Sequence, residues 1–186
     1  AFLADTVRAA AAANGVARII VVSSDPAPVA AGGEALFLPD PGQGLNAAVE
    51  AGIAYARTLD SLASVAVLTA DLPCLRPRDL DEALDQARYH GLAVVPDRHG
   101  TGTTMISALP YVAVSARFGN GSCEAHIRAG HSVLALPENS TLRADIDTVH
   151  DLADAVRRGV GDHTRAALQA AGPGERPRPR RHPSPV

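Results

Sequence analysis

Short apolar runs alternate with longer helical segments along this sequence, and that alternation is the strongest constraint on its fold. The runs are rich in Val, Ile, Leu and Ala and are apolar on both faces, which is typical of strands in a sheet covered on both sides. The segments between them carry apolar residues at helical spacing. Strands that alternate with helices in this way predict an α/β sandwich with a largely parallel sheet.

Local signals set the expected bounds of these elements. Pro77 stands in the first turn of one helix, Gly130 closes another, and Thr148 forms a capping box with the acid three residues later. Strands are expected at 17–22, 35–38, 64–70, 92–96, 103–107 and 132–136. Helices are expected at 1–14, 45–59, 77–90, 122–129, 148–158 and 162–171, with Gly15 and Gly91 just past the ends of the first and third.

Composition excludes several classes of protein. The chain has 186 residues, 46% of them hydrophobic, which is enough for one domain with a sizeable core. All 17 basic residues are arginine, so no mechanism can use a lysine of this chain. The net charge of −3 and the lack of an apolar run near the roughly 20 residues of a membrane span argue against nucleic acid or a membrane as a partner. Two cysteines, Cys74 and Cys123, are too few for a disulfide framework, which favours a reducing cytoplasm.

The two ends of the chain differ from the part between them. Residues 173–186 are rich in Pro and Arg, so we expect a disordered tail after a single domain at 1–172. A weak anion-binding arm is the alternative interpretation of this tail. The sequence opens at Ala1 rather than at Met, which suggests a fragment or a truncated reading frame.

Acidic residues follow the clearest predicted strand and precede the capping box. Asp71 comes directly after the run 64–70, at the strand end where open α/β sheets bind ligands. Asp145 and Asp147 point to the same side, about 7 Å apart, if their segment is extended. Carboxylates on one face repel unless a cation lies between them, and Mg²⁺ is held by such acids together with substrate phosphates. A helix cap or a solvated turn is the alternative for each acid.

Two loops rich in Gly, Ser and Thr lie between these acids in the sequence. Residues 97–104 follow a strand, and residues 118–122 lead into a helix whose N-terminus would attract phosphate or carboxylate. Backbone N–H groups and hydroxyls in such loops can wrap an anion, because glycine permits close approach. Each loop alone is more often an ordinary turn, but two of them beside three acids form a more specific candidate site.

A third glycine pattern, at 42–47, fits the dinucleotide-binding fingerprint only superficially. Pro41 intervenes after a short strand, and no acid stands at the expected spacing after a second strand. The pattern therefore argues against an NAD-binding dehydrogenase. Contact of Asn46, at the start of a helix, with a base or a ribose is the better interpretation.

Five segments occur in an order and at a spacing that resemble a known family. They are Gly44–Asn46 (GLN), Ala70–Pro73 (ADLP), Pro96–Thr103 (PDRHGTGT), Arg117–Gly119 (RFG) with Ser122, and Leu142–Thr148 (LRADIDT). Together they resemble the guanylyltransferases of deazaflavin coenzyme F-420 biosynthesis, which act on 2-phospho-L-lactate or, in actinobacteria, on phosphoenolpyruvate. The resemblance covers the chain up to about residue 170 and implies a Rossmann-like α/β/α nucleotidyltransferase sandwich with a mostly parallel sheet.

The resemblance also implies roles for individual residues. Three acids would hold Mg²⁺, namely Asp71, Asp145 and Asp147. The phosphorylated three-carbon acid would be received by Thr103, Gly119 and Ser122, and the guanine nucleotide would lie near Gly44, Leu45 and Asn46. The implied reaction is in-line attack of the acid's phosphate on the α-phosphorus of GTP, which needs positioning and charge neutralisation more than a general base. The oligomeric state stays open, with a homodimer as one expectation.

One departure from the family leaves other interpretations open. Family members open with a strand and a loop carrying Ala-Lys-x-Arg-Leu, whose cations grip the triphosphate, and this sequence has neither that element nor a lysine. We therefore expect weak activity or none unless that element is supplied. The alternatives are a transferase with another phosphate or sugar-phosphate acceptor, and a non-catalytic module that binds the phosphoacid without GTP turnover. The Arg-only, Ala-rich composition favours phosphoenolpyruvate as the acceptor.

Overall fold

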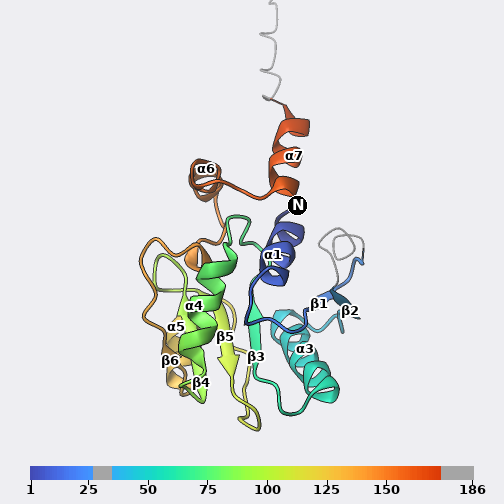
Figure 1. Ribbon diagram of the computed structural model, residues 1–186, viewed down its shortest axis with the longest axis vertical. Coiled ribbons are helices and arrows are strands. Elements are labelled where there is room, and N and C mark those ends of the chain that lie inside the picture. The colour runs from blue at the N-terminus through green and yellow to red at the C-terminus, as the bar shows by residue number, and fades with distance from the viewer. Residues whose placement is uncertain (27–34, 173–186) are drawn as a thin grey trace, which may run out of the picture.

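Helices cover both faces of a central sheet in the computed structural model, which describes residues 1–26 and 35–172 (Figure 1). The tail expected at 173–186 lies outside the described residues. The helices are α1 (Phe2–Ala11), α3 (Leu45–Leu59), α4 (Pro77–Ala87), α5 (Ser122–Arg128), η1 (Thr141–Arg143, a 3-10 turn), α6 (Val149–Arg158) and α7 (Asp162–Ala171). The strands are β1 (Ile20–Ser23), β2 (Leu36–Pro39), β3 (Val65–Leu68), β4 (Leu92–Pro96), β5 (Thr103–Ala108) and β6 (Ser132–Val133).

The central sheet has four strands in the order β3-β5-β4-β6. Strand β5 is antiparallel to both β3 and β4, whereas β6 is parallel to β4, so three of the four strands share one direction. A separate pair, β1 and β2, is parallel. The mostly parallel α/β/α sandwich is confirmed, with β5 as its reversed strand.

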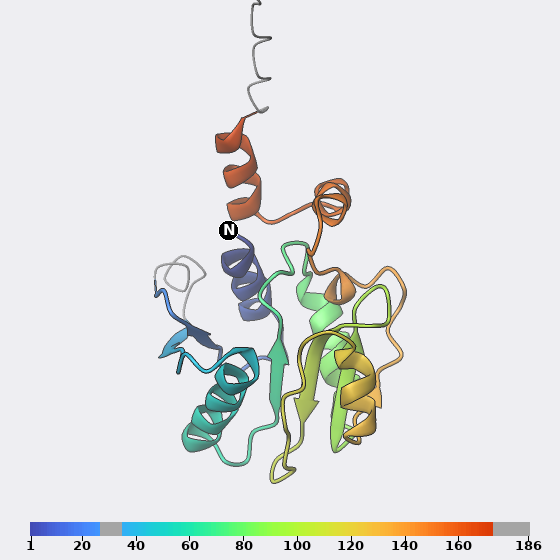
Figure 2. The ribbon, with the colours of Figure 1, turned by 180° about the vertical axis from the view of Figure 1, so that it is seen from behind.

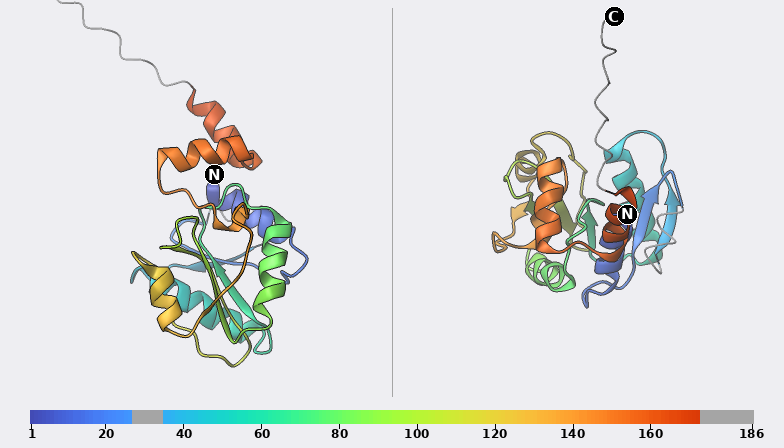
Figure 3. Two further views of the ribbon diagram at one scale, coloured as in Figure 1. Left: turned by 90° about the vertical axis from the view of Figure 1, so that its left-hand side faces the viewer. Right: turned by 90° about the horizontal axis from the view of Figure 1, so that it is seen from above.

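The core lies on both sides of β4 and β5. Helices α1 and α4 lie on one face of the sheet and α3 and α5 on the other (Figures 2 and 3). The side chains of Val94, Val95, Met105 and Ile106 are almost completely buried between these layers. Each such side chain stabilises the fold by roughly 1.5–3 kcal/mol. The most rigid part of the molecule is therefore the β4–β5 pair, which positions the loops at its ends.

Most of the expected elements are confirmed, with two helices shorter than predicted. The capping box before α6 is present: Thr148 Oγ1 accepts from the Asp151 amide at 3.2 Å, and Asp151 Oδ2 accepts from the Thr148 amide at 2.8 Å. Helix α1 ends at Ala11, not at residue 14, because the Gly15 amide donates to Asp81 of α4 instead of capping α1. Helix α4 likewise ends at Ala87 rather than at residue 90.

Helices α6 and α7 lie beyond the sheet, at the end toward which β3 runs (Figure 3). The carboxylate of Asp5, buried in α1, accepts from the amides of His163 and Thr164 at 3.0 and 2.8 Å, which satisfies the first turn of α7. A Cβ at Gly161 would overlap that carboxylate, so the close approach needs glycine.

Within residues 1–26 and 35–172, no helix is both long and apolar enough to cross a membrane. Cys74 and Cys123 are free and buried.

Candidate functional site

Asp71 stands in the turn after β3, where α1 holds the backbone on both sides of it. The hydroxyl of Thr6 donates to the Ala70 carbonyl and accepts from the Leu72 amide, both at 3.2 Å. Leu72 is fully buried and anchors the turn in the core. Asp71 Oδ1 is buried as well, yet it has no hydrogen-bond partner among the described residues. A buried carboxylate oxygen left unpaired is costly and calls for a physical explanation.

Asp145 and Asp147 lie in the irregular segment between η1 and α6, which is neither helix nor strand. Arg143 ties this segment to the turn after β4, because its Nη2 donates to the Asp97 carbonyl at 3.0 Å and its Nε donates to the Pro96 carbonyl at 3.3 Å. On the other side, the capping box fixes the start of α6. Asp145 is half-buried and Asp147 is exposed.

The three acids act on one another through space although they are far apart in the sequence. Burial raises the pKa of Asp71 and the charge of Asp147 adds to the rise, while hydrogen bonding to the Thr69 side chain and to the Asp71 backbone partly opposes it. Burial also raises the pKa of Asp145 to about 6, with further contributions from the charges of Asp71, Asp147 and Asp97. The charge of Asp147 thus disfavours the charged forms of Asp71 and Asp145, and the charge of Asp71 adds to this effect on Asp145, which is the condition that a bound cation relieves.

The acids supply part of a metal site, not a complete one. Within the described residues, no group of three or more His, Cys, Asp or Glu side chains is arranged to hold a metal ion. Mg²⁺ is usually held by one or two carboxylates together with substrate phosphates and water. The unpaired Asp71 Oδ1 and the hard oxygen donors of all three acids fit that incomplete arrangement.

The turn after β4 is organised by Asp97, whose importance the sequence did not reveal. The buried carboxylate of Asp97 accepts from the amides of Thr101 and Gly102, both at 2.9 Å. A Cβ at Gly102 would lie 2.6 Å from Asp97 Oδ2, so only glycine fits there. These two amides are engaged by the protein itself and are not free to wrap an anion. What the turn does is hold Thr103 at the start of β5.

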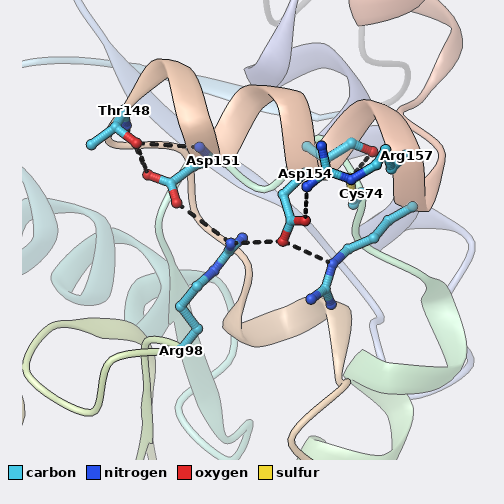
Figure 4. A network of polar contacts seen from close by, with 8 residues as sticks. Cys74, Arg98, Thr148, Asp151, Asp154 and Arg157 are labelled. Carbon is cyan, nitrogen blue, oxygen red and sulfur yellow. Dashed lines mark hydrogen bonds and ion pairs between the residues drawn. The ribbon is translucent and has the colours of Figure 1, made fainter.

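Arg98, in the same turn, points to α6 (Figure 4). Its Nη1 lies 3.4 Å from Asp151 Oδ1 and 3.1 Å from Asp154 Oδ2. Asp154 also pairs with Arg157 at 2.6 Å. Since the Arg98 side chain is mostly buried, these contacts fasten the turn to α6 next to the acidic segment. Arg98 therefore links the turn after β4 to helix α6, and Arg143 links the same turn to the acidic segment.

The structure brings Thr103 and Ser122 together under the loop that precedes α5. Their hydroxyl oxygens are 3.1 Å apart, and the two residues are 5% and 2% exposed. Gly119, in the loop, is exposed and has a φ of +132°, a conformation that favours glycine. The three residues expected to receive the phosphoacid are thus neighbours in space.

The segment expected near the nucleotide begins α3 and reaches the same loop. Asn46 Oδ1 accepts from the Phe118 amide at 2.8 Å, and Asn46 Nδ2 donates to the Phe118 carbonyl at 3.1 Å. Gly44, with a φ of +91°, and the exposed Leu45 precede it. The side chain of Asn46 therefore holds the loop before α5, a role that the sequence did not indicate.

His126 is a further residue beside the hydroxyl pair that sequence reasoning did not single out. It is fully buried, with Nδ1 3.1 Å from Thr103 Oγ1 and Nε2 3.1 Å from the Arg117 amide nitrogen. The one available signal is its spacing, because residues four apart lie on the same face of a helix and Ser122 stands four positions earlier.

An α/β/α sandwich with acids after a strand end and a hydroxyl pair beside them defines a nucleotide-handling transferase. The model of the MobA-like NTP transferase domain matches residues 1–166. This chain belongs to that family, and the expectation of a nucleotidyltransferase is confirmed.

Curated proteins that are similar to this chain have a more specific name than the domain family. The phosphoenolpyruvate guanylyltransferase of Streptomyces scabiei (strain 87.22) is 42% identical over 176 residues, covering 90% of this chain and 81% of the relative. That of Thermomonospora curvata is 41% identical over 176 residues, covering 93% and 77%. The resemblance seen in the sequence motifs is confirmed by these relatives.

A solved structure from Desulfovibrio desulfuricans G20, described as a nucleotide-diphospho-sugar transferase, shares the fold. Its TM-score is 0.65 at 21% identity, with 91% of this chain and 80% of that chain covered. At this identity the likeness concerns the fold alone.

Proposed function

We propose that this chain transfers GMP from GTP to phosphoenolpyruvate, or to 2-phospho-L-lactate, with release of pyrophosphate. The relatives named phosphoenolpyruvate guanylyltransferase support the first acceptor. The structural observation that carries the proposal is the buried Oδ1 of Asp71, which has no hydrogen-bond partner among the described residues, together with the raised pKa of Asp71 and of Asp145. We place the reaction in the cytoplasm and in coenzyme F-420 biosynthesis on the strength of the family resemblance.

Mg²⁺ is the cation that we expect at these acids, held by Asp71, Asp145 and Asp147 with the remaining ligands from GTP. When bound, the ion would neutralise charge on the triphosphate. The hard carboxylate oxygens suit Mg²⁺ better than a softer metal. Asp71 is the residue on which this part of the proposal depends most, because its Oδ1 is buried without a hydrogen-bond partner among the described residues.

The chain's own residues would mainly position the reactants. A phosphate oxygen of the acceptor forms the new bond to the α-phosphorus, while the bond from that phosphorus to the bridging oxygen breaks and pyrophosphate leaves with the electron pair. The attacking phosphate is already ionised at neutral pH, so no residue has to remove a proton. Thr103, Gly119 and Ser122 would hold the acceptor, and Gly44, Leu45 and Asn46 would border the guanine nucleotide.

Pyrophosphate release from GTP and Mg²⁺ tests this proposal, with phosphoenolpyruvate and 2-phospho-L-lactate as separate acceptors. The chain should be assayed beside a form extended upstream by the lysine-bearing element of the family. We expect pyrophosphate release with phosphoenolpyruvate as the acceptor. No pyrophosphate from either form with either acid would overturn the proposal.

A further inference from the structure

His126 joins the hydroxyl pair to the loop before α5 through both of its ring nitrogens. Nδ1 faces Thr103 Oγ1 and Nε2 faces the Arg117 amide, each at 3.1 Å. The rings of Phe118 and His131 lie edge-on to it, with centroids 5.2 and 5.1 Å away. The ring is therefore buried and held in one orientation, with a partner at each nitrogen.

The Arg117 contact determines which nitrogen carries the proton. A backbone N–H can only donate, so Nε2 must be the unprotonated, accepting nitrogen. The proton of the neutral ring then sits on Nδ1, the less common tautomer of a free histidine, and Nδ1–H donates to Thr103 Oγ1. The main chain of the loop thereby sets the hydrogen-bond direction at Thr103.

That direction leaves one hydroxyl proton uncommitted. Thr103 and Ser122 together have two hydroxyl protons, and the contact between their oxygens uses one. Because His126 donates to Thr103, the ring does not consume the second proton. The opposite tautomer would take that proton and would leave the Arg117 amide without its acceptor. With the observed partners, the hydroxyl pair keeps one donor, which suits an anionic oxygen.

We propose that His126 is a positioning residue that, as the Nδ1–H tautomer, keeps Thr103 and Ser122 as a net hydrogen-bond donor to an anionic oxygen of the acceptor acid. The same ring holds the Arg117 end of the loop, while Asn46 holds Phe118 from α3. The identity of the anion rests on the proposed function, whereas the tautomer does not.

The electrostatic surroundings keep the ring neutral. Burial, together with the charges of His131 and Arg117, lowers the pKa of His126 to about 4, and a backbone hydrogen bond with Ser122 partly opposes them. At neutral pH the ring therefore has one proton and one accepting nitrogen, as the contacts require.

Side-chain ¹⁵N and ¹³C NMR of the histidines in the full chain tests the tautomer directly. We expect His126 to be neutral and protonated on Nδ1 at pH 7. Protonation on Nε2, or a doubly protonated ring at that pH, would overturn the inference whatever the protein binds.

Binding of phosphoenolpyruvate in the presence of Mg²⁺, followed by calorimetry, tests the role. Substitution of His126→Gln removes the Nδ1 donor while offering an acceptor toward Arg117, and we expect at least about tenfold weaker binding. His131→Asn is the matched control, because it can keep the contact of His131 Nδ1 with the His126 carbonyl, and we expect binding within about twofold of the unsubstituted chain. Mg²⁺ affinity, measured separately, should be the same in both variants.

The outcomes separate the two proposals. If the unsubstituted chain and its upstream-extended form both fail to bind phosphoenolpyruvate, the proposed function fails and the anion named here fails with it, while the NMR result still decides the tautomer. If the unsubstituted chain binds and His126→Gln binds equally well, the positioning role is overturned. If His126→Gln also loses Mg²⁺ affinity, its effect is a general loss of structure, and the positioning role is overturned as well.

Discussion

Two regions at the same end of the sheet differ in how their buried polar groups are paired. The acidic edge, formed by Asp71, Asp145 and the neighbouring Asp147, contains a buried oxygen without a partner and two carboxyl groups whose pKa is raised. The hydroxyl cluster, formed by Thr103, Ser122 and His126, is more deeply buried, and all of its polar side-chain atoms have partners. The acidic edge holds a buried oxygen that is unpaired within the described residues, whereas each polar side-chain atom of the hydroxyl cluster has a partner and one hydroxyl proton remains to be donated.

The difference indicates at which of the two regions a bound cation would supply a missing interaction partner. Unsatisfied buried charge lowers stability and persists where it serves binding or catalysis. A satisfied polar network instead makes the structure rigid before any ligand arrives. The acidic edge therefore lowers the stability of the folded protein by itself, whereas the hydroxyl cluster is preorganised. Substitutions in the two regions should therefore change stability with opposite signs.

The largest effect is expected for His126→Ala. It deletes a fully buried ring and leaves the Arg117 amide unpaired, so the free energy of unfolding should fall by about 3 kcal/mol. Chemical denaturation of the chain and the variant measures this. A loss below about 1 kcal/mol would mean that the hydroxyl cluster is not the preorganised unit described above.

Asp71→Asn should weaken Mg²⁺-dependent GTP binding by at least about tenfold without lowering stability. The neutral amide avoids the cost of a buried, unpaired charge, so the free energy of unfolding should stay the same or rise. Calorimetry and denaturation on one sample measure both quantities.

Asp79→Asn is the matched control for Asp71→Asn, because Asp79 is a buried acid whose Oδ2 accepts from the Thr141 amide and hydroxyl. It should lose about 1–2 kcal/mol of stability and keep its Mg²⁺ affinity. A stability loss in Asp71→Asn equal to that of the control would contradict the contrast between the two regions.

Asp147→Asn should weaken Mg²⁺-dependent substrate binding several-fold, with little change in stability because this residue is exposed. Titration of the variant with GTP at fixed Mg²⁺ measures the change. Unchanged binding would remove Asp147 from the metal site and leave Asp71 and Asp145 as its acids.

The smallest effect is a pH dependence of Mg²⁺ affinity. With a pKa of about 6, Asp145 is largely ionised at pH 7 and half-protonated at pH 6, so the affinity should fall by about twofold over that interval. Calorimetric titration at the two pH values measures it, and Asp145→Asn should abolish this dependence. If a twofold change in Mg²⁺ affinity persists in the variant, a group other than Asp145 causes the pH dependence.

Without Mg²⁺ the two regions should respond to acid in opposite directions. The folded protein holds the proton of Asp145 more tightly than the unfolded chain does, so this group's contribution to stability rises as the pH falls from about 6 to about 4. The pKa of His126 is lowered instead, so its contribution is present above about pH 6.5 and is lost as the pH falls toward 4. Asp145→Asn should accordingly make the protein more sensitive to acid than the unsubstituted chain.

Elements whose bounds depend on neighbours in the chain could be predicted from the sequence. Helix α3, strand β4 and helix α7 have the expected bounds, and the capping box before α6 is present. These features depend on residue spacing and on contacts three or four residues apart. The ends of α1 and α4 could not be predicted in the same way, because Gly15 binds Asp81 of another helix. The antiparallel direction of β5 could not be predicted either, because an apolar run does not reveal the direction in which a strand runs.

By itself, the sequence determined the α/β class, the family and the chemical types at the site, because motifs and hydrophobic periodicity are properties of the chain. Only the tertiary structure decided how those types act. It brought Asp71 close enough to Asp145 and Asp147 for their charges to interact. It also placed Asn46 in a hydrogen bond with the Phe118 amide, and it determined through the Arg117 amide which nitrogen of His126 carries the proton. Burial, charge and hydrogen-bond direction depend on which groups are near in space, and distance along the chain does not contain that information.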